Sequence, residues 1–280
     1  MLGRELDELV ERASSLGFST SCSTNGYWAV NRKAASERMR RLKAVGLKTI
    51  HFSTGDMHAR FVPAERIVNG AVAAWDAGIP NVGISIESFE GATFDWRRIT
   101  EHPEIVRRKK PALTVFSRPW IPNAAGKGDA VLRHNSRFGR FRKNNISGCG
   151  TILDTIAVTP SLRLMSCCGY PIESVPDLRL GSVATSTLKE ALDASDDDLI
   201  KLWLHVAGPE RMLMFVKEHL PDYELPRPYA DICQTCVHLH RDKEAMRILR
   251  EHVDEVAKDI LWVYSALRDR AAGGQGIKTR

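Results

Sequence analysis

The sequence predicts an α/β fold, in which four βα units form a parallel sheet, followed by a small α+β part and C-terminal helices. Strand-like and helix-like hydrophobic patterns alternate over the first half of the chain, which is typical of parallel strands joined by right-handed helical crossovers. After residue 117 a loop rich in proline and glycine interrupts the alternation. Five of the six cysteines lie in the second half, so that half is expected to form a separate, cysteine-bearing part.

The first βα units are indicated by apolar spacing and by turn residues. Residues 6–16 carry apolar side chains at helical spacing, and this helix ends at Gly17. Residues 18–24 read as a strand that stops at Asn25-Gly26, a strong turn signal. The elements that follow are a helix over 35–42 closed by Gly46, a strand over 48–53 and a polar loop over 54–58.

The third and fourth units follow the same rules. Pro63 lies near the first turn of a helix with an apolar stripe over 67–75, which ends before Gly78. Strands are predicted over 81–87 and 112–116, with a helix over 96–109 between them. Four consecutive βα units cannot close a barrel, and an open parallel sheet leaves its outer edges unpaired. We therefore expect either a small open α/β domain or a barrel whose first strands precede Met1.

The second half has a different pattern of apolar and turn residues. Residues 152–158 and 162–165 predict a short hairpin around Thr159-Pro160-Ser161. Helices are expected after it. The first is capped by Ser195 and three aspartates and stops at Gly208, and the second begins at Pro209. A long helix follows over 248–267, and the tail over 271–280 is expected to be disordered.

The composition is that of a soluble globular protein, with 43% hydrophobic and 26% charged residues and a formal charge of +6. Two basic runs, 107–110 and 133–145, could hold phosphates or an acidic peptide. A solvated linker is favoured for such a stretch, and a nucleic-acid partner is not. No apolar run is long enough to span a bilayer, and the acidic first segment is no signal peptide. We therefore expect no membrane partner and a cytoplasmic location.

The cysteines carry the most specific chemistry. Cys149, the pair Cys167-Cys168 and Cys233-x2-Cys236 come from three separated segments, one of them at metal-ligand spacing. This pattern predicts a metal or iron–sulfur centre assembled by folding. Disulfides are disfavoured by the low cysteine density, and a buried structural thiol fits Cys22 better.

Alternatives at the same residues stay open. Zinc held by four thiolates would look the same in sequence as an iron–sulfur cluster. A thioredoxin-like role for Cys233 and Cys236 needs a strand-to-helix start, and the stretch that contains them, PRPYADICQTC (226–236), looks like a loop. His238 and His240, just past Cys236, are expected at the surface rather than as ligands.

These residues resemble the later part of a radical SAM enzyme with a C-terminal SPASM/Twitch-like auxiliary iron–sulfur domain. The resemblance covers most of the chain and lies in five stretches. They are TNGYWA (24–29), HFSTGDMHARFVP (51–63), CGTILDTIAVTPSLRLMSCCG (149–169), GPERML (208–213) and YADICQTC (229–236). The resemblance implies a partial radical SAM TIM-type barrel over 1–125, an auxiliary-cluster domain over 126–240, and a C-terminal helix with its tail over 241–280.

The same resemblance implies an auxiliary [4Fe-4S] cluster on Cys149, one of Cys167 and Cys168, Cys233 and Cys236. Cys167 is favoured because it follows its strand at the usual offset of the family. In the barrel, the resemblance places Asn25, Ser53, Asp56 and Glu87 near the nucleoside or substrate, and His58 where related proteins also show histidine. Within these stretches the chain departs from the pattern of the family at Gly55, which stands where an aspartate is common, with Asp56 next along.

Radical SAM enzymes generate their radical on a cluster held by a C-x3-C-x2-C loop, and this sequence contains no such motif. The resemblance therefore implies a maturase that modifies a peptide or small molecule, incomplete as given and inactive alone. S-adenosylmethionine would bind only if a missing N-terminal part were present. The alternative is a non-catalytic, metal-stabilised module, holding iron–sulfur or zinc, that binds a peptide or completes the barrel of a partner chain.

Overall fold

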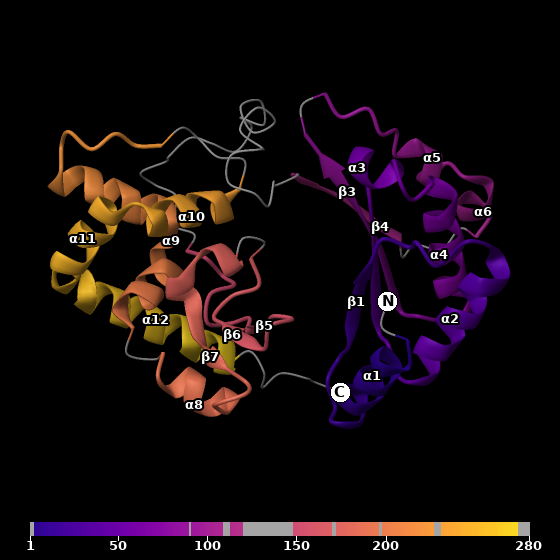
Figure 1. Ribbon diagram of the computed structural model, residues 1–280, viewed down its shortest axis with the longest axis horizontal. Helices are drawn as coiled ribbons and strands as arrows, with labels where there is room; N and C mark the ends of the chain where they lie inside the picture. The colour runs from indigo at the N-terminus through magenta and orange to yellow at the C-terminus, as the bar shows by residue number, and fades with distance from the viewer. Residues whose placement is uncertain are drawn as a thin grey trace. The chain divides into compact units, whose positions relative to one another are not determined.

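The computed structural model describes residues 3–89, 91–108, 113–119, 148–169, 172–195, 198–226 and 231–273 (Figure 1). The chain divides into two compact units, Met1–Trp120 and Ile121–Arg280. The first contains the predicted βα units, and the second contains the five clustered cysteines and the C-terminal helices. The whole of the basic run 133–145, residues 109–110 of the other basic run and residues 274–280 of the tail therefore lie outside the described residues.

The first unit is built on a four-stranded parallel sheet, as the sequence predicts. Its strands are β1 (Ser21–Thr24), β2 (Thr49–Thr54), β3 (Asn81–Ser88) and β4 (Leu113–Pro119), and they pair in chain order. Sequential parallel neighbours require a crossover after each strand, which the helices between them provide. The α/β class and the strand positions are confirmed.

The main helices of this unit are α1 (Arg4–Ser15), α2 (Arg32–Ala44) and α4 (Ala64–Asp76). Figure 1 shows α2 and α4 side by side on one side of the sheet. Along β2, Ile50, Phe52 and Thr54 are buried, whereas the residues between them are only half-buried. The packing is tight where α4 crosses β2, since a Cβ on Gly70 would lie 2.4 Å from the ring of Phe52.

Two predicted elements of this unit differ in the structure. The helix expected over 96–109 is two short helices, α5 (Arg97–Thr100) and α6 (Pro103–Val106), because Pro103 lacks the N–H that a continuous helix would need. The polar loop expected over 54–58 contains a single helical turn, α3 (Asp56–Ala59). The second difference moves Asp56 and His58 onto one short, ordered element.

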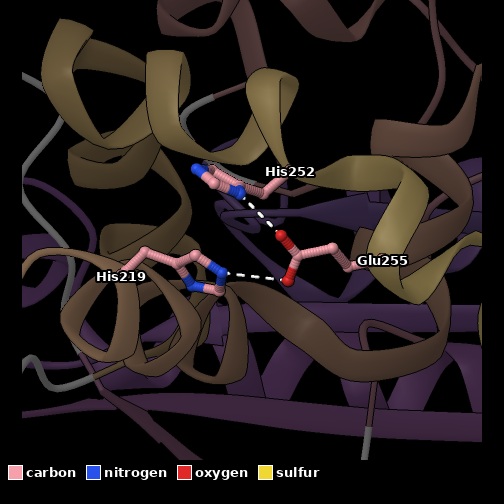
Figure 2. Close-up of side chains that lie close together, drawn as sticks. All are labelled: His219, His252 and Glu255. Carbon is pink, nitrogen blue, oxygen red and sulfur yellow. Dashed lines mark hydrogen bonds and ion pairs between the residues drawn. The ribbon is translucent and has the colours of Figure 1, made fainter.

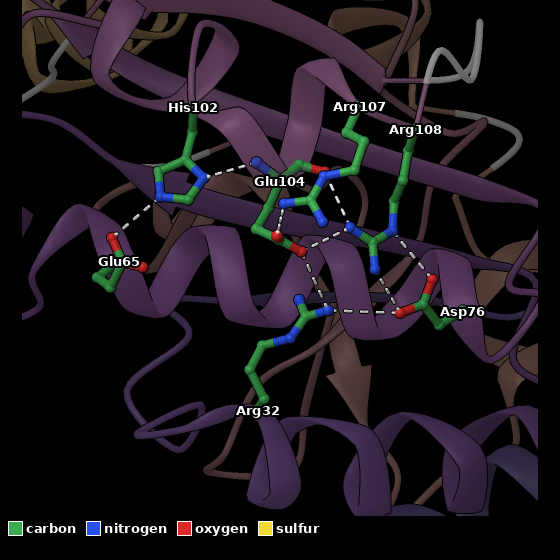
Figure 3. Close-up of polar contacts among 7 residues, drawn as sticks. All are labelled: Arg32, Glu65, Asp76, His102, Glu104, Arg107 and Arg108. Carbon is green, nitrogen blue, oxygen red and sulfur yellow. Dashed lines mark hydrogen bonds and ion pairs between the residues drawn. The ribbon is translucent and has the colours of Figure 1, made fainter.

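An ion-pair network at the surface joins α2, α4 and α6 (Figure 3). Arg108 Nη2 lies 3.0 Å from Asp76 Oδ2, and Arg108 Nη1 lies 2.8 Å from Glu104 Oε2. Arg32 reaches the same two carboxylates, and Arg107 also pairs with Glu104. These contacts raise the pKa of Arg108, foremost through its bond to Asp76, against the effect of burial. The arginines of the run 107–110 are thus neutralised by carboxylates of the same unit.

The second unit combines a small antiparallel sheet with helices. Strands β5 (Ala157–Val158) and β6 (Arg163–Met165) form the predicted hairpin, and a third strand that was not predicted, β7 (Arg179–Ser182), pairs with β6. Its other elements are two 3-10 turns, η1 (Ile172–Ser174) and η2 (Pro176–Leu178), and the helices α8 (Leu188–Asp193), α9 (Leu199–His219), α10 (Ile232–Arg241), α11 (Lys243–Glu251) and α12 (Val253–Gly273).

Helix α9 contains both helices expected around Gly208. Gly208 adopts φ 77° and ψ 163°, outside the helical region, so the two halves meet at a kink that Pro209 follows. The N-cap is Asp198, the last of the three aspartates in the predicted cap, and not Ser195. The long terminal helix is likewise interrupted, at His252, between α11 and α12. Buried side chains of α9, α11 and α12, including Leu202, Leu249 and Ile260, belong to one core together with Cys167.

None of the helices in the described part of the chain has both the length and the apolar composition that a bilayer crossing needs.

Candidate metal centre

Four of the predicted cysteines converge in the second unit. One pocket is lined by Cys149, Cys167, Cys233 and Cys236, together with apolar residues such as Ile152 and Val175. A Cβ placed on Gly169 would lie 3.1 Å from Cys233 Sγ and 3.7 Å from Cys167 Sγ, so these two sulfurs face the same point. The other two cysteines lie apart from the pocket. Cys168 is exposed, and Cys22 lies on β1 in the other unit.

Cys149 is positioned by the kink in α9. The N–H of Cys149 donates to the carbonyl of Leu204, at 3.1 Å. Pro209 has no N–H, so it cannot donate to the carbonyl of His205, four residues before it. The segment before Cys149 can therefore pass close to that carbonyl. Gly148 makes that close passage, because a Cβ at this position would lie 1.7 Å from His205 O. A glycine before Cys149 is therefore a steric requirement of the site.

Cys167 follows β6, as the sequence predicted. Its neighbour Ser166 is fully buried and bonds Leu178 O through both its N–H, at 2.9 Å, and its hydroxyl, at 3.0 Å. Ser166 O in turn accepts from the N–H of Leu153, at 2.7 Å, which ties the turn after Cys149 to this segment. The N–H of Gly169 bonds the sulfur of Cys167 itself. The segment is thus held on both sides of the thiol.

Cys233 lies in the first turn of α10, and Cys236 follows it three residues later. Their spacing places both on one face of the helix. Asp231 caps this helix by accepting from Cys233 N, at 2.8 Å. The sequence indicated a loop here, and that interpretation was wrong for the cysteines themselves. A helix N-terminus favours anionic sulfur, because its free N–H groups carry partial positive charge.

Burial and mutual proximity raise the pKa of these thiols. Burial, with the nearby carboxylate of Asp231, raises the pKa of Cys233 to about 12. The pKa of Cys236 is raised by burial and by Cys149, Cys167 and Cys233, and that of Cys167 chiefly by burial. Several thiolates would repel one another here without a cation. A bound metal or cluster supplies that cation, and its binding would release the thiol protons.

The spacing of the sulfurs bears on which group fits. Zinc–sulfur bonds of about 2.3 Å in a tetrahedron place the sulfurs about 3.8 Å apart. Among the described residues, a single set of three metal-binding side chains has its ligand atoms all within 4.8 Å of one another. It consists of His219, His252 and Glu255. The cysteines form no such set. A cluster, with iron and sulfide between the thiolates, needs the wider arrangement.

His238 and His240 were expected at the surface, and for His240 this is wrong. Its side chain is only 3% exposed, and Nδ1 lies 3.2 Å from Asp177 Oδ2. His238 is 29% exposed, beside Asp242. His240 links α10 to the turn that carries Asp177, and so helps to fix the helix of Cys233 and Cys236.

Buried His240 predicts a pH-dependent stability. Burial foremost lowers its pKa, with Lys201 and Arg250 acting in the same direction and Asp177 opposing them. A histidine whose folded pKa lies below its unfolded value of about 6.5 stabilises the fold above that pH, and this stability is lost as pH falls toward the folded pKa. We expect the free energy of unfolding to fall more steeply below about pH 6.5 in wild type than in His240→Gln, by at most about 1.4 kcal/mol per pH unit. Denaturant unfolding from pH 7.5 to 5 measures this, and parallel curves would contradict it.

The predicted residues of the first unit gather at the carboxyl ends of β1, β2 and β3. Ser53 lies in β2, and Asn25 directly follows β1, where its Oδ1 accepts from Tyr27 N at 3.1 Å. Asp56 accepts from Thr93 N, at 2.9 Å, and from Phe94 N, at 3.0 Å. Although burial opposes them, these bonds lower the pKa of Asp56. The Asp56 carboxylate therefore anchors the loop after β3.

Glu87 and His58 form an ion pair at this edge of the sheet. Their side chains are 15% and 30% exposed, so the pair is largely withdrawn from water. Gly55 makes room for it, because a Cβ there would lie 2.7 Å from Glu87 Cβ, and the φ of Gly55 is +144°. Glycine at position 55, where the resemblance led us to expect aspartate, thus has a local steric reason.

No protein-family model matches this sequence, and no curated protein matches it either.

Proposed function

We propose that this protein binds a [4Fe-4S] cluster through Cys149, Cys167, Cys233 and Cys236, as the auxiliary-cluster part of a radical SAM maturase. The observation that carries the proposal is the convergence of four thiols from three segments on one pocket. Such a cluster would relay electrons or anchor a peptide or small-molecule substrate.

The surrounding residues would do three things for that cluster. Apolar neighbours such as Ile152 and Val175 limit access of water to the pocket. The N–H of Gly169, bonded to Cys167 sulfur, would stabilise thiolate charge. The start of α10 presents its partial positive charge to Cys233 and Cys236.

The parallel sheet of the first unit would serve as part of a radical SAM barrel. The carboxyl ends of parallel strands are where α/β enzymes place ligands, and Ser53, His58 and Glu87 lie there. These residues would contact the nucleoside or substrate, while Asp56 would hold the loop around them.

The sequence argues against radical generation by this chain alone. A radical-generating cluster needs three thiolates, and the four pocket cysteines leave only Cys22 and Cys168, which lie in different units. We expect anaerobically reconstituted protein, supplied with dithionite and S-adenosylmethionine, to form no 5′-deoxyadenosine while retaining its cluster absorbance. Mass spectrometry of the product checks this, with a complete radical SAM enzyme as the positive control. Enzyme-dependent 5′-deoxyadenosine would contradict the auxiliary assignment.

A second candidate is a non-catalytic module whose sheet is completed by a partner chain. Strands β1 and β4 are the ends of the four-strand order, and their outer edges pair with no other strand among the described residues. An open strand edge is a template for another chain. Size-exclusion chromatography with light scattering, together with metal analysis, separates the two hypotheses: a stable monomer that holds one zinc ion and no iron favours the module.

A further inference from the structure

A second cluster of metal-ligating side chains lies in the second unit, apart from the four cysteines. His219 is the last residue of α9, His252 joins α11 to α12, and Glu255 lies in the first turn of α12. Their ligand atoms all lie within 4.8 Å of one another. Figure 2 shows both imidazoles directed at the same carboxylate. Two segments, the end of α9 and the α11–α12 junction, thus bring two histidines and one glutamate to one point.

The distances fit a shared ion. His219 Nε2 lies 3.0 Å from Glu255 Oε2, and His252 Nδ1 lies 2.6 Å from Glu255 Oε1. Two ligands bound to one zinc ion at about 2.1 Å in a tetrahedron lie about 3.4 Å apart. Small side-chain rotations would therefore admit an ion between these groups.

The ring of His219 is already oriented as in a metal ligand. Its Nδ1 lies 3.0 Å from the carbonyl of Phe215 and donates to it, so a neutral ring would have its free lone pair on Nε2, the nitrogen that faces Glu255 and would bind an ion placed between them. The ring of Phe215 packs against the imidazole, with centroids 4.1 Å apart. A backbone carbonyl on the second nitrogen is the usual support of a metal-bound histidine.

We propose that His219, His252 and Glu255 bind a divalent transition-metal ion of the zinc class. Two imidazoles and one carboxylate match the ligand preferences of zinc, whereas magnesium and calcium prefer oxygen ligands. Glu255 is 53% exposed, so water can complete the coordination. The ion would fasten the end of α9 to the start of α12. This proposal is independent of the cysteine centre.

The test uses the full-length protein with Co²⁺ as a spectroscopic substitute for Zn²⁺. Thiolate-bound Co²⁺ gives a strong charge-transfer band in the near ultraviolet, and Co²⁺ on nitrogen and oxygen ligands does not. We expect wild type to bind one Co²⁺ without that band and to release it to Zn²⁺. Glu255→Gln and His219→Ala should each weaken this binding at least ten-fold and leave any thiolate-type signal unchanged.

His102→Ala is the matched control. His102 Nε2 also faces a carboxylate, 3.4 Å from Glu65 Oε2, but without a second histidine in the described part of the chain. Its affinity for Co²⁺ should equal that of wild type. Cooperative thermal unfolding of metal-free Glu255→Gln verifies that the variant is folded. Equal affinity of wild type and Glu255→Gln, or no thiolate-free Co²⁺ on wild type, would overturn the proposal.

Discussion

Gly148→Ala is expected to abolish the cysteine centre, although it changes no cysteine. The new methyl group would lie 1.7 Å from His205 O and 2.6 Å from Val206 O, which are backbone atoms of α9. Neither atom can move as a flexible side chain could, so the segment that carries Cys149 must leave the helix. We expect the free energy of unfolding to fall by about 3 kcal/mol and the bound iron to be lost. Denaturant unfolding and iron analysis measure the two effects.

Gly150→Ala is the matched control, two residues away on the same segment. A Cβ at Gly150 would meet no atom within 4 Å, and its φ is not in the left-handed region. We expect wild-type iron content and a change in stability within about 0.5 kcal/mol. If both alanine variants bind iron equally, the close passage beside α9 does not determine the site.

Cys236→Ser is expected to remove the bound group almost completely. Cys236 packs in the core beside Cys149, Cys167 and Cys233, and serine would leave one corner of the site without a thiolate. Because the binding of a structural metal group is coupled to folding, its loss should lower the melting temperature as well as the iron content. We expect iron to fall from about four atoms per chain to below one.

Cys168→Ser separates this loss from a general effect of thiol replacement. Cys168 is adjacent to a pocket cysteine in sequence, yet it is exposed and does not line the pocket. Its serine variant should keep wild-type iron content and melting temperature. If Cys168→Ser loses the cluster and Cys167→Ser keeps it, the assignment of Cys167 as the ligand is wrong.

The sequence predicted what depends on local pattern. Strands β2 and β3 were found within one residue at each end, because their apolar runs are bounded by clear turn signals. Four of the five predicted cysteines line one pocket, which agrees with the expectation from their spacing in sequence that they come together in the fold. Pro103 was the missed local signal, and it could have divided the helix predicted over 96–109.

The remainder depends on contacts between distant segments. Nothing around residue 148 reveals that this glycine passes a carbonyl of residue 205, because the requirement arises from packing. No sequence motif links His219, His252 and Glu255, because α9 and the α11–α12 junction come together only in the fold. The burial of His240 is another such case, because its partner Asp177 lies 63 residues earlier.

The central claim is that the four pocket thiols hold an iron–sulfur cluster. The most direct test is an anaerobic count of iron, acid-labile sulfide and zinc in the purified, reconstituted wild-type protein, beside the Cys236→Ser variant. We predict about four iron and four sulfide per wild-type chain, and almost none in the variant. Zinc held by the cysteines, with no iron or sulfide in the wild-type protein, would contradict the claim.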